Sequence, residues 1–302
     1  MSSIRTLLQG SIDYAGLFPP AEVDMRTALE NYARYSSGPS SWALGRFILP
    51  VSRLDEFAVH MPGTPLRPID SPWRLAALMG TNIEADVDAI DEFNRRYSSG
   101  GVSIDSVEVK ATSEADIGEI IAGVPSTLQT YIEVPVEPDP SNLIRSIGLG
   151  GRRAKVRTGG VTQDVFPRGP DLLRFVRATI DHAVPFKATA GLHHPLRATY
   201  RLTYAENSPM GRMFGFLNLM LAVAFFRSGM NESDVLRVLE EDDPAAFQPD
   251  DSGIGWRGAR VDIRALSDAR RLGMVSFGSC SFTEPIEDLQ SLHLLAAPVS
   301  QT

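Results

Sequence analysis

Two strand-like segments of this 302-residue chain each carry a lysine where a buried strand is expected to be apolar. Residues 154–160 read Ala-Lys-Val-Arg-Thr-Gly-Gly and residues 186–194 read Phe-Lys-Ala-Thr-Ala-Gly-Leu-His-His, which places Lys155 and Lys187 32 residues apart. That interval is about one strand–helix repeat of a parallel α/β fold. Burying an ammonium group is costly unless it is paired or deprotonated, so two such lysines indicate an active site.

The chemistry open to two such lysines is Schiff-base formation. A lysine beside other cations in a partly dry pocket loses its proton more easily, and the free amine attacks a carbonyl carbon. Lys155 is the better nucleophile because Arg157 shares its strand face, and Lys187 would supply a second positive charge; the two roles are also open to exchange. Glu133 or His193 would move the protons that every imine step requires. This chemistry calls for no cofactor and no metal.

The elements around these lysines predict a closed barrel. Most strand candidates are followed by a helical pattern of apolar residues, as at residues 24–35, 83–97, 113–122 and 171–182. Eight strand–helix repeats predict a (β/α)8 TIM-type barrel in one domain over residues 1–302, with an open doubly wound sheet as the alternative. The eight strands are expected at residues 11–18, 44–51, 74–80, 106–111, 129–136, 154–158, 185–190 and 274–278.

One interval breaks this rhythm between the seventh and eighth strands. Residues 196–273 contain no convincing strand, and helices are expected at residues 210–229, 231–239 and 262–272, with Asn231 as an N-cap. We predict a helical insertion that covers the barrel mouth or packs against a second subunit, and the apolar helix at 210–229 makes a homo-oligomer plausible. The alternative is that the insertion only adds packing.

The period of two along each strand assigns charged side chains to the barrel interior. Residues two apart share a face, and in each charged segment the opposite face is apolar or small, as packing against an outer helix requires. The charged face should then point toward the carboxyl-end mouth, where barrel enzymes have their active sites. The alternative is a buried salt-bridge network that merely fills the barrel. The expected inward set is Asp13, Glu108, Lys110, Glu133, Lys155, Arg157, Lys187 and Thr189.

Two further segments are expected at the mouth. His193 and His194 follow the seventh strand, and either would bind substrate or transfer protons; adjacent histidines on a strand end point apart, so a shared metal is not favoured. After the eighth strand, Ser279, Cys280 and Ser281 would present hydroxyl and backbone N–H groups to an anion near a helix N-terminus.

The lysine segments resemble those of a known family. Residues 155–159 (Lys-Val-Arg-Thr-Gly) and 187–191 (Lys-Ala-Thr-Ala-Gly) look like the Lys-Thr-Ser-Thr-Gly and Lys-Ala-Ser-Gly-Gly type segments of deoxyribose-phosphate aldolase, a class I aldolase with a (β/α)8 barrel. The resemblance implies Lys155 as the Schiff-base nucleophile and Lys187 as the partner that lowers its pKa. Residues 278–281, which begin with Gly278, look like the family's phosphate loop. The family's strand-four aspartate has no match, since that strand offers Glu108 and Lys110.

Composition excludes several other classes of function. The net charge of −8, the pI near 5.2 and the lack of a Lys/Arg-rich stripe argue against a nucleic-acid partner. A single cysteine excludes an intramolecular disulfide. The longest apolar stretch, residues 213–226, is interrupted by Asn218 and is shorter than a bilayer span. No secretory signal is visible, so we predict a cytoplasmic protein without a membrane partner.

These observations leave three functional hypotheses. The first is an aldolase-like lyase that acts on a small anionic carbonyl compound through a lysine Schiff base. The second is a hydrolase or isomerase on the same barrel that uses His193, His194 and Glu133, with or without a divalent metal. The third is a non-catalytic anion-binding or sensor protein that retains the pocket.

Overall fold

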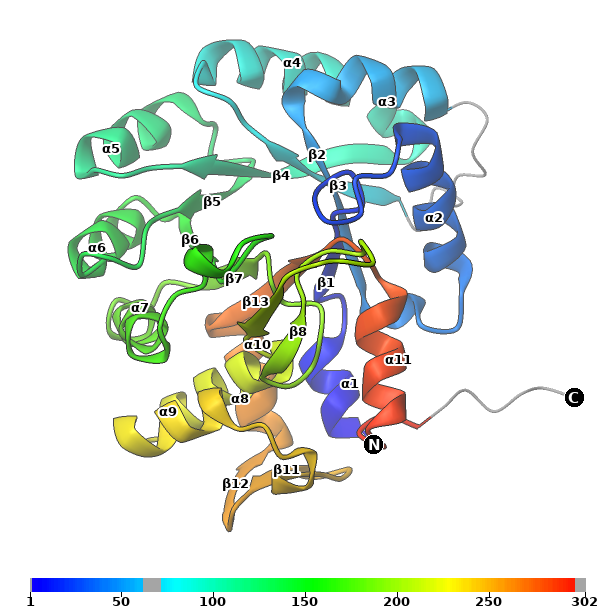
Figure 1. Ribbon diagram of the computed structural model, residues 1–302. Coiled ribbons are helices and arrows are strands. Elements are labelled where there is room, and N and C mark those ends of the chain that lie inside the picture. Colours follow the sequence, from blue (N-terminus) through cyan, green and yellow to red (C-terminus); the bar gives the residue numbers. More distant parts are fainter. Residues whose placement is uncertain (1, 62–71, 297–302) are drawn as a thin grey trace, which may run out of the picture.

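The eight predicted strands all form, and they close into a parallel barrel (Figure 1). The computed structural model describes residues 2–61 and 72–296. Going round the barrel, the order is β1, β13, β7, β6, β5, β4, β3 and β2, and β2 pairs again with β1. The closure confirms the predicted (β/α)8 barrel and rules out the open sheet. The strands are β1 Ile12–Tyr14, β2 Leu44–Pro50, β3 Trp73–Leu78, β4 Val102–Lys110, β5 Gln129–Glu133, β6 Arg153–Arg157, β7 Phe186–Thr189 and β13 Met274–Ser279.

The helices lie around the outside of the barrel, and local capping explains where several of them begin (Figure 1). Asp24 accepts the Thr27 backbone N–H at 2.9 Å, and Ser113 forms a capping box with Asp116. The patterns predicted near these caps and at α4 are therefore confirmed within two or three residues. The helices are α1 Ser2–Leu8, α2 Met25–Ser37, α3 Leu54–His60, α4 Ile83–Tyr97, α5 Glu114–Gly123, α6 Ser141–Leu149, α7 Gly169–Asp181, α8 Phe216–Arg227, α9 Glu232–Glu240, α10 Ile263–Leu272 and α11 Thr283–Ser291.

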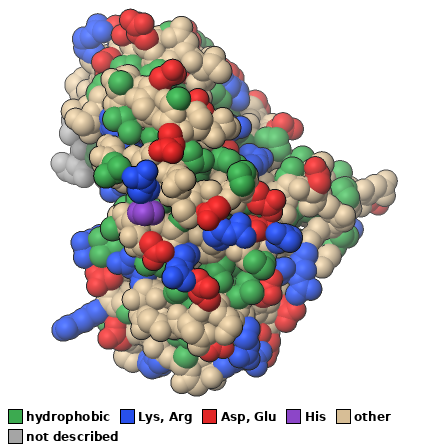
Figure 2. All heavy atoms as spheres, turned by 90° about the vertical axis from the view of Figure 1, so that its left-hand side faces the viewer, with side chains coloured by type: hydrophobic (Ala, Val, Ile, Leu, Met, Phe, Trp, Pro, Cys, Tyr) green, Lys and Arg blue, Asp and Glu red, His purple; other side chains and the backbone are tan. Residues whose placement is uncertain are grey.

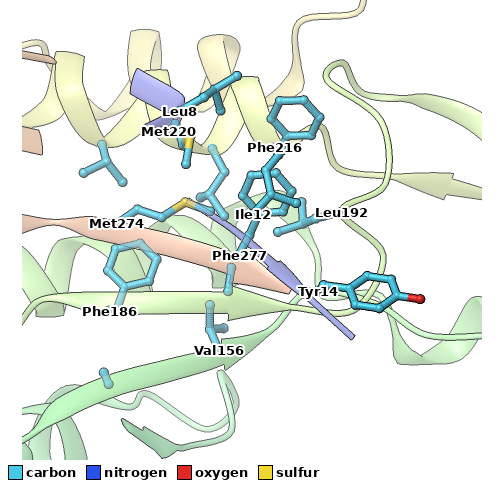
Figure 3. Close-up of a cluster of buried hydrophobic side chains, with 14 of the residues drawn as sticks. Leu8, Ile12, Tyr14, Val156, Phe186, Leu192, Phe216, Met220, Met274 and Phe277 are labelled. Atoms are coloured by element: carbon cyan, nitrogen blue, oxygen red, sulfur yellow. The ribbon is translucent and has the colours of Figure 1, made fainter. Parts of the chain in front are cut away.

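The apolar core lies between the barrel and its helices. Figure 3 shows Phe216 of α8 against Phe277 of β13, and these two rings stack with centroids 4.7 Å apart. Val156 on β6 and Phe186 on β7 are fully buried in the same core. Burying each such side chain contributes about 1.5–3 kcal/mol. Because successive side chains alternate, the outward packing of Val156 directs its neighbours on β6 into the barrel.

The insertion between β7 and β13 contains strands that the sequence pattern did not reveal. The expectation that residues 196–273 lack strands is wrong, since five short strands lie there. Each has only three or four residues, which is too few for a recognisable alternation of apolar and polar side chains. They form a two-stranded and a three-stranded antiparallel sheet. The helix expected from residue 210 begins later, at α8, since residues 210–213 belong to a hairpin. The strands are β8 Ala198–Arg201, β9 Met210–Met213, β10 Phe247–Pro249, β11 Gly253–Trp256 and β12 Ala259–Asp262.

Helix α8 gives no support to the self-association predicted from the insertion. Residues Phe216 to Phe225 of α8 are all buried within the chain, so this helix does not offer its apolar side chains to a second subunit. Figure 2 shows acidic and basic side chains intermingled over the face it presents. Among the described residues, we find no helix with the length and apolar character needed to cross a membrane.

Candidate active site

The strand register gathers the charged side chains at one level of the barrel. Lys155 on β6 lies opposite Glu133 on one side and Lys187 on the other, and Lys110 on β4 lies opposite Glu133. In a parallel sheet, directly paired residues project to the same face, so all four side chains project from the inner face of the barrel, with Lys110 reaching solvent at the end of β4. The inward direction that the sequence predicted for them is what the register produces.

One carboxylate joins the two buried lysines. Glu108 on β4 places Oε2 2.7 Å from Nζ of Lys155 and Oε1 2.5 Å from Nζ of Lys187. Burial alone would raise the pKa of Glu108, but the two ammonium groups outweigh it and lower that pKa to about 2. Glu108 therefore remains ionised at neutral pH and fixes the spacing of the two lysines.

Lys187 is held as a cation by a second acid. Its Nζ lies 2.6 Å from Oδ2 of Asp13 on β1, whose other oxygen accepts the Arg46 backbone N–H at 2.8 Å. Gly45 makes room for this carboxylate, because a Cβ there would lie 2.3 Å from Oδ1 of Asp13. Burial opposes the charge on Lys187, but Asp13 and Glu108 raise its pKa above the ordinary value. Lys187 therefore stays protonated.

Lys155 lies between two carboxylates. In addition to Glu108, it contacts Oε2 of Glu133 at 2.8 Å. The other Glu133 oxygen is 4.0 Å from Nζ of Lys110, whose side chain is 70% exposed. Glu133 thus connects the buried Lys155 amine to the solvent side of the site.

These side chains line a cavity of about 280 Å³ at the carboxyl ends of the strands. Residues of the loops after β1, β6, β7 and β13 also line it, so it opens at the end where barrel enzymes have their active sites. The chain has only three lysines among its 29 Lys and Arg residues, and all three line this cavity. Their scarcity is a signal that the analysis of strand patterns missed. Arginine cannot give up its proton in a protein, whereas lysine can.

Arg157 provides the strongest indication of an anionic ligand. It lines the cavity from the end of β6, and its guanidinium makes no hydrogen bond or ion pair with any residue that the structure describes. Thr189, its partner on β7, also lines the cavity. A guanidinium without a counter-ion at a cavity mouth is suited to a carboxylate or phosphate.

His193 lies at the cavity within a small cluster of polar groups. Its Nδ1 is 3.5 Å from Oε2 of Glu284, 3.4 Å from Oγ of Ser279 and 3.6 Å from Sγ of Cys280. Tyr204, from the loop between β8 and β9, brings its hydroxyl within 3.3 Å of the same Glu284 oxygen. Burial would lower the pKa of His193, but its contacts with Cys280 and Glu284 raise it to about 10.

His194 does not join the site, contrary to the prediction that it binds substrate. Its ring stacks on Tyr200 of β8 with centroids 3.6 Å apart, and its Nδ1 lies 2.6 Å from Oδ2 of Asp288. It is not among the cavity-lining residues. Adjacent side chains diverge, as expected, and the β8–β9 hairpin provides the ring that holds His194 away.

The segment after β13 is only partly available to a ligand. Gly278 and Cys280 line the cavity, whereas Ser279 is buried against His193. The Ser281 hydroxyl accepts the Glu284 backbone N–H at 3.2 Å, at the start of α11. Of the segment expected to bind an anion, Gly278 and Cys280 line the cavity, whereas Ser279 and Ser281 do not.

The fold and this site together define a parallel (β/α)8 barrel with a lysine-rich cavity at its carboxyl end. Within residues 2–61 and 72–296, no three His, Cys, Asp or Glu side chains come together in a way that would hold a metal ion. Comparison of the chain with protein-family models, curated proteins and solved structures gives no match. Function is therefore inferred from the geometry of the site.

Proposed function

We propose that the protein is a class I aldolase-like lyase that acts on a small anionic carbonyl compound through a Schiff base on Lys155. The observation that carries this proposal is the convergence of all three lysines of the chain on one cavity, two of them buried and joined by Glu108. Such a network costs stability when it only fills a core, because desolvation offsets most of the ion-pair energy. A catalytic role accounts for that cost.

The different environments of the two lysines assign their roles. Lys187 is held protonated by Asp13 and Glu108, and a protonated amine is not a nucleophile. Lys155 contacts Glu133, which extends toward Lys110 and solvent and gives the Lys155 proton a route out. We therefore assign Lys155 as the nucleophile and Lys187 as the fixed cation beside it.

The reaction follows from these roles. The neutral Lys155 amine attacks the carbonyl carbon, and a proton passes from the amine nitrogen to the carbonyl oxygen to give a carbinolamine. Glu133 or His193 protonates that hydroxyl, and water leaves as the iminium forms. The bond between the α and β carbons then breaks, and its electron pair passes into the iminium to give an enamine, while the β-hydroxyl loses its proton to the same base and becomes an aldehyde carbonyl. Protonation of the resulting enamine and hydrolysis of the imine release the second product. Arg157 and Lys110 hold the anionic group of the substrate.

Borohydride trapping followed by peptide mass analysis tests this proposal. The protein is incubated with small aldehydes, 2-oxo acids and sugar phosphates, and reduction fixes any imine as a stable adduct. With three lysines and the α-amino group as the only primary amines, each adduct can be assigned. We expect an adduct on Lys155 that is lost in Lys155→Arg, which keeps the positive charge, and retained in the matched variant Lys110→Arg. An adduct on Lys187 instead would exchange the two roles. No adduct on either buried lysine would contradict the proposal.

A further inference from the structure

The wall of the cavity is divided by chemistry into two halves. The strands β4 to β7 contribute every lysine, Glu108, Glu133 and Arg157. Within the described residues, β2, β3 and the loop after β1 contribute only apolar side chains. These are Ala15, Phe18, Pro19, Pro20, Ile48 and Leu78.

The apolar half lies at the same level as the charged half. Leu78 on β3 is the register partner of Glu108 on β4, and Ile48 occupies an inward position on β2 two residues before the partner of Leu78. A ligand atom bound at Lys155 therefore has charged groups on one side and hydrocarbon on the other. A substrate that extends from Lys155 toward β2 and β3 would meet Leu78 and Ile48 without a hydrogen-bonding side chain from these strands.

This division discriminates between two kinds of carbonyl compound. A hydroxyl group moved from water onto a wall without a partner loses about 1–3 kcal/mol. An aliphatic or aromatic group on the same wall gains about 25 cal/mol for each Å² buried. The cavity volume of about 280 Å³ lies at the small end of ligand sites, so few groups fit beyond the reacting carbons.

We infer that the substrate carries an anionic group on one side of its carbonyl carbon and an aliphatic or aromatic group on the other. This inference deepens the proposed lyase function and rests on it. It points to 4-hydroxy-2-oxo acids with an apolar substituent on C4. Arg157 and Lys110 hold the carboxylate, and the substituent packs against Ile48 and Leu78. Breaking the C3–C4 bond, with the C4 hydroxyl proton passing to the base and a proton added at C3, gives pyruvate and an apolar aldehyde.

Binding without reaction tests the division of the wall. Pentanoate and ribonate have the same chain length and the same carboxylate, but ribonate carries four hydroxyl groups. In thermal-shift titrations of the full chain, we expect pentanoate to bind at least about tenfold more tightly. Leu78→Asn should reduce that ratio toward one, and the matched change Leu149→Asn, at an exposed leucine of α6, should leave it unchanged. Equal binding, tighter binding of ribonate or no stabilisation by either compound would overturn the inference.

A second measurement separates this inference from the proposed function. Pyruvate is first trapped with borohydride to test for an imine on Lys155. In a separate reaction, the protein is given pyruvate with equal amounts of benzaldehyde and erythrose as competing aldehyde acceptors, and we expect the aldol product of benzaldehyde to predominate. If Lys155 is labelled but erythrose is the preferred acceptor, the inference of an apolar substituent is overturned and the Schiff-base function stands. Preferential pentanoate binding without any label on Lys155 would support the division of the wall and contradict the Schiff-base function.

Discussion

Two charged networks occupy the barrel strands, and only one of them lines the cavity. At the carboxyl end, Lys155 and Lys187 share Glu108. Toward the amino end, Arg46 on β2 makes two hydrogen bonds to Asp105 on β4, at 2.6 and 3.0 Å. Burial would lower the pKa of Arg46, but Asp105 raises it, and neither residue lines the cavity. Both networks satisfy buried or half-buried charge with good geometry.

The difference between them lies in the type of cation. The network near the amino end uses arginine, which stays charged throughout and forms a planar bidentate pair that links β2 to β4 across the intervening β3. The network at the mouth uses lysine, which can exist as a neutral nucleophile. Ion pairing alone therefore does not identify a functional site. The network at the mouth differs from the structural Arg46–Asp105 pair because it combines lysines, a shared carboxylate and a cavity.

The largest expected effect is the loss of turnover when the proposed nucleophile, Lys155, is replaced. Lys155→Arg keeps a cation beside Glu108 and Glu133 but cannot form an imine, so we expect aldol turnover to fall by at least about 10³-fold. The matched change in the other network, Arg46→Lys, loses the bidentate geometry; we expect about 1–2 kcal/mol less unfolding free energy with turnover retained. Steady-state kinetics and urea unfolding measure the two effects. Similar turnover losses in both variants would remove the distinction between the networks.

Much of the fold could be predicted from the sequence because it depends on local patterns. The eight strands follow from short apolar segments bounded by Gly, Pro and Ser, and helices follow from apolar spacing and caps such as Asp24 and Ser113. The short strands of the insertion could not be predicted, since three or four residues such as Met210–Met213 carry no periodic signal. Their pairing is decided by tertiary contacts.

The site could be predicted only in part. The period of two correctly directed Lys155, Lys187 and Glu108 inward. It could not show that Glu108 joins the two lysines, because that contact depends on barrel closure and side-chain length. The position of His194 depends on a hairpin that was not anticipated. The apolar half of the cavity was missed because a residue such as Leu78 has the same pattern as a core residue.

Removing the second lysine should give the largest loss of stability. Lys187→Met leaves Asp13 and part of Glu108 buried without a counter-charge, and we expect unfolding free energy to fall by about 3–5 kcal/mol. The matched change Lys110→Met, at an exposed side chain, should stay within about 0.5 kcal/mol. Urea midpoints for the two variants measure this contrast. Equal midpoints would show that Lys187 is not charged in the folded protein.

The ion pairs of Glu108 should be detectable in how the free energy of unfolding depends on pH below pH 4.5. Because the pKa of Glu108 is lowered from 4.5 to about 2, its contribution is complete above pH 4.5 and is lost as pH falls from 4.5 toward 2. The excess unfolding free energy of the wild type over Glu108→Gln should therefore shrink across that range. Glu119→Gln, at an exposed glutamate of α5, serves as the matched control and should show little difference at any pH. A Glu108 difference that does not change with pH would contradict the ion-pair assignment.

The smallest expected effects are those of replacing His193 and His194, and they should differ between these two adjacent residues. The raised pKa of His193, about 10, means that its charged form stabilises the fold fully below pH 6.5 and that this contribution is lost as pH rises through 10. The advantage of the wild type over His193→Gln should thus decrease between pH 6.5 and 10, as measured by urea unfolding across that range.

The matched change His194→Gln tests whether position at the cavity decides catalytic effect. Its imidazole is held by Tyr200 and Asp288 away from the cavity, so we expect about 1 kcal/mol less stability from the lost hydrogen bond and wild-type turnover. His193→Gln should instead reduce turnover, because the ring lies at the cavity beside Glu284. Equal turnover losses in the two variants would show that these histidines act through the structure of the loop, and proton transfer would then depend on Glu133 alone.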